Sequence, residues 1–215
     1  MDTSSIEAII VECNSDPGAD HDLRDLLTVV AEQHGRTASE EEIEQATQFV
    51  QSYIKQAPYM MKVAWTAAGT IGLESEMSQI LSMVKNYWEQ DDDIIPDNLG
   101  MIGLLDDAYC SLSTLQAVSD HFQLQTGKYL FPDDLSAANR LMRRIIGEPY
   151  ASDLDRLVMT TMRETGAIES MKRLASNEKQ LDFARQSTIW NHGPAGDMGV
   201  NALEGIGLYP DSSKA

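Results

Sequence analysis

Aspartates gather on both sides of one short apolar stretch near the middle of the sequence. Residues 91–107 hold six carboxylates, namely Asp91, Asp92, Asp93, Asp97, Asp106 and Asp107. Clustered carboxylate oxygens are the ligands that hard cations such as Mg²⁺ and Ca²⁺ take. We therefore regard four of them as candidate metal ligands, namely Asp93, Asp97, Asp106 and Asp107. Two other roles stay open: turn and cap residues that accept hydrogen bonds from local backbone amides, or an acidic surface for a basic partner.

The residues between these carboxylates predict a corner between two helices. Pro96 restricts Ile95 to extended or turn conformations. Gly100 and Gly103 allow another backbone to approach closely. Asp106 and Asp107 then fall near the start of the next helix, where free amides and the helix dipole favour a carboxylate.

This stretch resembles the hallmark of the YkvA-like family of small helical proteins, which runs approximately Asp-Leu-Ile-Pro-Asp-x-Ile-Pro-x-x-Gly-x-x-Asp-Asp. The matching residues, in order, are Asp93, Ile95, Pro96, Asp97, Gly103, Asp106 and Asp107. Gly100 stands where family members usually have a second proline, and the flanking segments are amphipathic where the family has strongly apolar ones. The family has no established reaction, so the resemblance over residues 91–109 implies a helical corner and no mechanism.

The enzyme motifs that the chain resembles are incomplete. The Asp92-Asp93-x-x-x-Asp97 run resembles the magnesium motif of isoprenoid synthases, but no second aspartate-rich helix is apparent to face it. Cys110 and His121 fall on one expected helix about 16 Å apart, too far to act together. We therefore predict no catalytic residues and no cofactor other than a divalent cation, and we favour a protein that is not an enzyme.

A basic ridge is expected on the helix over residues 135–146. Arg140, Arg143 and Arg144 share one face, because residues three and four apart are neighbours on a helix surface. These arginines are candidates for binding a partner, or for pairing with acidic residues of the same fold.

The composition limits the classes of partner. The formal net charge of −18 argues against nucleic acid, since phosphate binding needs a basic surface. The two cysteines, Cys13 and Cys110, have no metal-ligand spacing and predict free thiols in a reducing compartment such as the cytoplasm. The sequence has no apolar run long enough to span a membrane, and its start lacks the pattern of a signal peptide.

Apolar residues recur at three-and-four spacing along most of the chain and predict an all-α fold. Ser39 and Glu42 have the form of a capping box, and Pro58 is expected to end the helix that follows them. Further helices are expected over residues 23–34, 60–68, 74–89, 104–124, 135–146, 154–164 and 167–190, with the last broken near Ser176.

These segments amount to an irregular helical bundle of about seven to nine helices in one domain, 1–191, with a seam near 127–133. Residues 192–215 are rich in glycine and predict a C-terminal arm that is either flexible or extended and docked on its own domain or a neighbour.

Three functions remain open from the sequence. The first is a non-enzymatic interaction or regulatory protein of the bacterial cytoplasm that binds a protein partner or forms a homo-oligomer. The second is a metal-dependent hydrolase or metal-binding protein that uses the acidic corner. The third is an acidic, immunity- or antitoxin-like protein that neutralises a basic partner.

Overall fold

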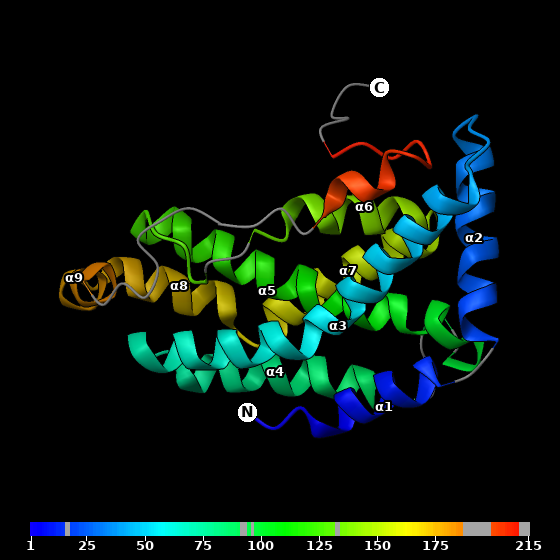
Figure 1. Ribbon diagram of the computed structural model, residues 1–215. Helices are drawn as coiled ribbons and strands as arrows, with labels where there is room; N and C mark the ends of the chain where they lie inside the picture. The colour runs from blue at the N-terminus through cyan, green and yellow to red at the C-terminus, as the bar shows by residue number, and fades with distance from the viewer. Residues whose placement is uncertain (16–17, 91–93, 96, 132–133, 187–198, 211–215) are drawn as a thin grey trace.

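The computed structural model of this chain describes residues 1–15, 18–90, 94–95, 97–131, 134–186 and 199–210 (Figure 1). These residues form nine α-helices, two short 3-10 helices and no strand, which confirms the all-α prediction and the expected number of helices. The helices are α1 (Ser4–Asn14), α2 (Ala19–Gln33), α3 (Glu40–Ile71), α4 (Glu74–Trp88), α5 (Leu104–Thr126), α6 (Ser136–Ile146), α7 (Tyr150–Glu164), α8 (Ala167–Ser176) and α9 (Glu178–Gln186). Within these ranges, no helix combines the length and apolar composition that a membrane span needs.

Helix α5 lies at the centre of the fold. It contacts α3 and α4 as well as α6, α7, α8 and α9, and Figure 1 shows it running through the middle of the bundle. A helix surrounded in this way buries side chains on nearly every face. Its buried residues accordingly include polar ones, among them Asp106, Asp107 and Ser111.

Helix α3 begins where the sequence predicts and ends much later. The hydroxyl of Ser39 accepts a hydrogen bond from the Glu42 amide at 3.3 Å, and the Glu42 carboxylate accepts one from the Ser39 amide at 2.7 Å. The prediction that Pro58 ends this helix is wrong, and so is the separate helix over 60–68. Although Pro58 cannot donate to the carbonyl of Ile54, both residues are buried among other core side chains, and this packing outweighs the lost hydrogen bond.

The other predicted helices are present with shifts at their ends. Helices α8 and α9 meet at Asn177, as expected from the break near Ser176. Helix α7 starts at Tyr150, four residues before the prediction: Pro149 is its N-cap residue, and the Pro149 carbonyl accepts a hydrogen bond from the Asp153 amide at 3.2 Å. Helix α1 had no counterpart among the predicted helices.

One hydrophobic core joins both halves of the chain. Leu105 and Leu112, before the expected seam at 127–133, belong to the same buried cluster as Leu141 and Leu154, after it. The described part of the C-terminal arm, residues 199–210, also joins this core: Leu203 and Ile206 are fully buried, and the 3-10 helix Val200–Leu203 contacts α3 and α6. The remaining residues of the arm, 192–198 and 211–215, lie outside the described residues.

We expect Ser39→Ala to lower the free energy of unfolding by about 1 kcal/mol, because the Glu42 amide in the first turn of α3 loses the hydroxyl that accepts its hydrogen bond. Urea unfolding followed by circular dichroism measures the change. The control is Ser52→Ala, an exposed serine in the interior of the same helix, where alanine is the better helix former. Equal effects of the two substitutions would contradict the capping role.

Candidate functional site

The predicted acidic corner holds a buried carboxylate, that of Asp106. Asp106 is 0% exposed. Its Oδ2 accepts hydrogen bonds from the Tyr87 hydroxyl at 2.9 Å and from the Ile95 amide at 3.0 Å. Its Oδ1 accepts one from the Asp107 amide at 3.1 Å. The side chain therefore joins the end of α4, the α4–α5 connection and the first turn of α5.

Burial controls the protonation of this carboxyl group. Removal from water raises the pKa of Asp106, although the hydrogen bonds from Ile95 and Tyr87 act in the opposite direction. Burial also raises the pKa of the Tyr87 hydroxyl, and the neighbouring Asp106 carboxylate adds to that shift. The phenol thus keeps its proton and serves as a hydrogen-bond donor.

Asp107 lies beside Asp106 and is 1% exposed. Its backbone carbonyl accepts a hydrogen bond from the Ser111 hydroxyl at 2.7 Å, and that hydroxyl oxygen accepts one from the Trp88 indole N–H at 2.7 Å. The last two residues of α4, Tyr87 and Trp88, are thus both joined to α5 by buried hydrogen bonds. This part of the corner therefore stabilises the packing of α4 against α5.

The structure places the predicted metal ligands only in part. Asp93 lies outside the described residues, and for Asp97 the backbone alone is described, at the start of the 3-10 helix Asp97–Ile102. In the part of the chain that the structure describes, no three His, Cys, Asp or Glu side chains come together to hold a metal ion. The Mg²⁺ or Ca²⁺ site therefore stays a prediction.

The expected close approach at this corner is present at Gly100. This residue has a φ of +62°, and a Cβ added to it would lie 3.0 Å from the Cβ of Ala19 in α2. Any larger residue would both strain the backbone and push against α2. The resemblance to the YkvA-like corner stays a prediction, because Asp93 and Pro96 lie outside the described residues.

Arg143, in the middle of the basic ridge on α6, is held by acidic residues of the same fold. The Arg143 Nε donates to Asp155 at 2.8 Å, and its Nη2 donates to Glu148 at 2.9 Å. Arg140 is exposed and Arg144 is partly buried. A partner-binding role of the three arginines stays a prediction, and Arg143 can take part only by exchanging its internal partners.

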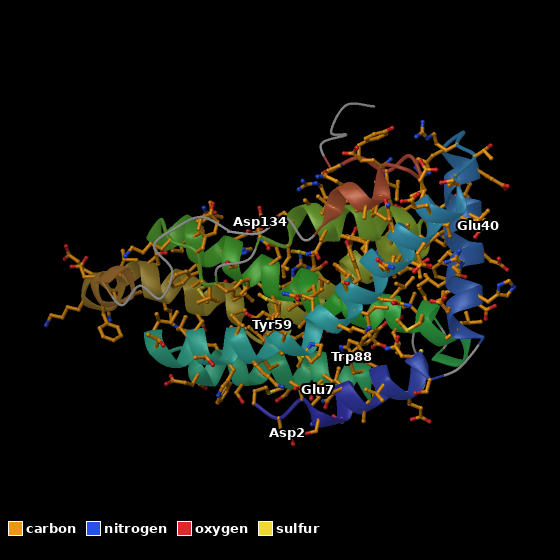
Figure 2. The ribbon with its side chains drawn as sticks, viewed as in Figure 1. Asp2, Glu7, Glu40, Tyr59, Trp88 and Asp134 are labelled. Carbon is orange, nitrogen blue, oxygen red and sulfur yellow. The ribbon has the colours of Figure 1, made fainter. Side chains whose placement is uncertain are left out.

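A second candidate site, which we call the α1–α3 groove, was missing from the predictions. It is a hollow of about 330 Å³ lined by Glu7, Ile10, Val11, Asn14, Lys55, Pro58, Tyr59 and Lys62. Residues three and four apart on α1 face residues three and four apart on α3, since the two helices contact each other along these faces. Figure 2 labels Glu7 on α1 and Tyr59 on α3.

The surface of this groove is mostly apolar and open to solvent. Ile10 and Pro58 are buried beneath it, whereas Val11 is 64% and Tyr59 is 52% exposed. Exposed apolar surface with a polar rim is typical of a binding site for another molecule.

The rim of the groove carries two lysines. The Lys62 ammonium pairs with Glu7 at 2.6 Å, whereas Lys55 is exposed and forms no ion pair with another described residue. Residues 1–100 hold only five lysines and arginines against 19 acidic residues. With two lysines and one glutamate in its lining, the groove is a locally basic surface on an acidic protein.

The sequence held a weak sign of this groove. Tyr59 and Lys55 are four residues apart, on the face of α3 that turns away from its core stripe, and Val11 lies outside the stripe of Ile6 and Ile10. An exposed aromatic residue beside a lysine is common on helices, however, and only the pairing of α1 with α3 brings these residues together.

The whole chain matches no protein-family model, no curated protein and no solved structure.

We expect the free energy of unfolding of the wild type, relative to Asp106→Asn, to fall as the pH rises from about 4. The pKa of Asp106 is raised by folding, so between the unfolded and folded pKa values the native state holds more protons, and stability is lost as the proton leaves. Urea unfolding of both proteins between pH 4 and 8 measures the difference. A difference that is constant with pH would show that Asp106 has the same pKa in both states.

The predicted metal site can be tested by measuring the unfolding temperature with and without Mg²⁺ or Ca²⁺. If Asp93, Asp97, Asp106 and Asp107 bind Mg²⁺ or Ca²⁺, either cation raises the unfolding temperature, because a ligand of the folded state stabilises it. Asp97→Asn then removes the rise, and Asp120→Asn, a matched change on α5 outside the corner, leaves it intact. An unfolding temperature that does not respond to either cation in the wild type would contradict the site.

Proposed function

We propose that this chain is a non-enzymatic binding protein of the cytoplasm whose α1–α3 groove takes an apolar segment of a partner protein that carries carboxylates. The observation behind this proposal is the exposed apolar lining of the groove beside the unpaired Lys55. The cytoplasmic location is proposed from the two cysteines, which form no disulfide.

The shape of the groove suits a peptide segment. Two helices that lie side by side form a linear hollow, and an amphipathic helix can lay its apolar residues into such a hollow. Tyr59 and Val11 present a large apolar area without further rearrangement, and an aromatic side chain at the centre of an interface commonly contributes much of the binding energy.

The charges of the groove select the chemistry of the partner. A carboxylate on the segment gains a partner in Lys55, whereas a basic segment is repelled by Lys55, since Glu7 already pairs with Lys62. Rim charges mainly affect the association rate and the choice of partner, so the apolar contacts provide the affinity and the lysines the selectivity. A basic segment would instead be drawn to other, acidic parts of a protein whose net charge is −18.

We expect a random peptide library selected on the wild-type protein to yield sequences that combine aromatic or aliphatic residues with Asp or Glu. Binding of a synthetic peptide from this selection falls about tenfold in Tyr59→Asp and in Lys55→Glu, because each loses a contact worth roughly 1.4 kcal/mol. It also weakens as salt is added. Fluorescence anisotropy measures each affinity.

Two variants serve as matched controls for this experiment. Leu124→Asp alters another exposed apolar residue, 78% exposed on α5, and Lys179→Glu reverses an exposed lysine on α9. Both should bind the peptide as the wild type does. Peptides that bind all four variants equally would overturn the proposal. So would a concentration-dependent dimer, seen by sedimentation, that Tyr59→Asp dissociates, since a second copy would then cover the groove.

A further inference from the structure

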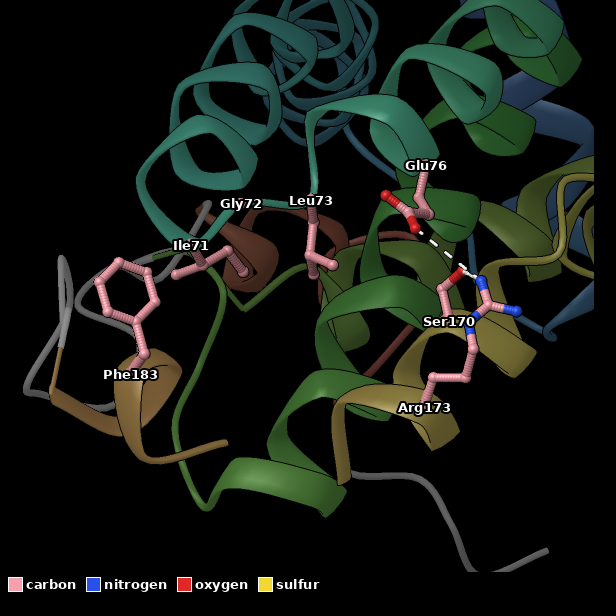
Figure 3. A pocket seen from close by; sticks show the side chains of 7 residues that line it. All are labelled: Ile71, Gly72, Leu73, Glu76, Ser170, Arg173 and Phe183. Atoms are coloured by element: carbon pink, nitrogen blue, oxygen red, sulfur yellow. Dashed lines mark hydrogen bonds and ion pairs between the residues drawn. The ribbon is translucent and has the colours of Figure 1, made fainter. Parts of the chain in front are cut away.

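A larger hollow lies at the other end of α3, where the chain turns into α4. It has a volume of about 440 Å³ and is lined by Ile71, Gly72, Leu73, Glu76, Ser170, Arg173 and Phe183 (Figure 3). Gly72 adopts a φ of +73°, which ends α3 and reverses the chain so that Ile71 and Leu73 both line the hollow. Helices α8 and α9 supply the opposite wall.

One end of this hollow is polar and carries both signs of charge. The Arg173 guanidinium, on a side chain that is 69% exposed, donates through Nη2 to the Ser170 hydroxyl at 2.6 Å. The same nitrogen forms a long ion pair with the Glu76 carboxylate at 3.9 Å, beyond hydrogen-bond range (Figure 3). The remaining N–H groups of the guanidinium are available to a carboxylate.

The other end of the hollow is apolar. Figure 3 shows the Phe183 ring next to Ile71, with Leu73 between this pair and the charged end. Phe183 is 56% exposed, although it is aromatic and belongs to a helix that contacts the core helix α5. A ligand with an apolar body would cover this ring.

We propose that this hollow binds a free α-amino acid with a large apolar side chain. Its carboxylate would pair with Arg173, its ammonium with Glu76, and its side chain would lie against Leu73 and Phe183. A purely anionic ligand would face the Glu76 carboxylate, and a purely cationic one would face Arg173. A zwitterion is the head group that satisfies both charges, and like-charge contacts make the other two less favourable.

The size and composition of the hollow agree with such a ligand. Small-molecule sites have volumes of about 300–1,000 Å³ and combine an apolar lining with a few polar groups that fix orientation. The charged groups lie at one end only, so they set the direction in which the amino acid enters. Ser170, a residue that is 4% exposed, accepts a hydrogen bond from Arg173 and so helps to position the guanidinium.

We expect isothermal titration of the wild-type chain with L-phenylalanine to show binding, and N-acetyl-L-phenylalanine and L-phenylalanine amide to bind at least about tenfold more weakly. Each analogue removes one charge of the head group and so one charge-assisted hydrogen bond. L-alanine should also bind more weakly, because it leaves Phe183 uncovered. Binding of either blocked analogue as tightly as the free amino acid overturns the proposal, and so does the absence of L-phenylalanine binding at millimolar concentration.

Substitutions locate the binding in this hollow. Arg173→Gln and Glu76→Gln should each weaken L-phenylalanine binding about tenfold. Arg156→Gln, the same change at an exposed arginine of α7, should leave it unchanged. Equal affinities in all three variants would place the binding elsewhere and overturn the assignment. The comparison of analogues on the wild-type chain tests the proposal even where a variant fails to fold, which circular dichroism shows.

Discussion

The burial of helix α5 is the constraint on which the rest of the structure depends. Because other helices surround it, its polar side chains must find partners inside the protein. Three of them accept hydrogen bonds from backbone amides of the connecting segments: Asp106 from Ile95 at 3.0 Å, Gln116 from Leu135 at 2.8 Å and Ser119 from Leu130 at 3.3 Å. The side chains of α5 therefore hold in place both the segment that precedes this helix and the segment that follows it.

This dependence explains which parts of the fold could be predicted. The capping box between Ser39 and Glu42 is local, so four consecutive residues suffice to place the start of α3. Whether the same helix continues through Pro58 depends on the burial of Pro58 among distant residues, which a sequence pattern does not contain. The prediction that a proline ends the helix was therefore wrong there. The helix predicted over 74–89 was correct, because an apolar face such as that of Met77, Ile80 and Leu81 forms a helix against any core that buries it.

The candidate sites, too, include features that the sequence could reveal and features that only the packing of helices creates. The sequence marked Asp106 as unusual, and a hydrogen-bonding role with local amides was among the roles left open for it. Its bond from Tyr87, nineteen residues away, required the packing of α4 against α5. Val11 and Tyr59 are separated by 48 positions and neither belongs to a motif. Their groove exists only because α1 packs on α3, so no pattern within either helix could reveal it.

The continuity of α3 through Pro58 has a consequence for both proposed surfaces. Lys55, Tyr59 and Lys62 line the groove, and Ile71 lines the hollow, so both surfaces are built on one helix. Lys62 and Ile71 are nine residues apart, which corresponds to about 13 Å along a helix axis. Had the helix ended at Pro58, Lys55 would lie on a different element from Lys62, and the groove would have no fixed width. The core residues that keep α3 intact, Ala57 and Met61 among them, thus hold the two surfaces at a constant separation.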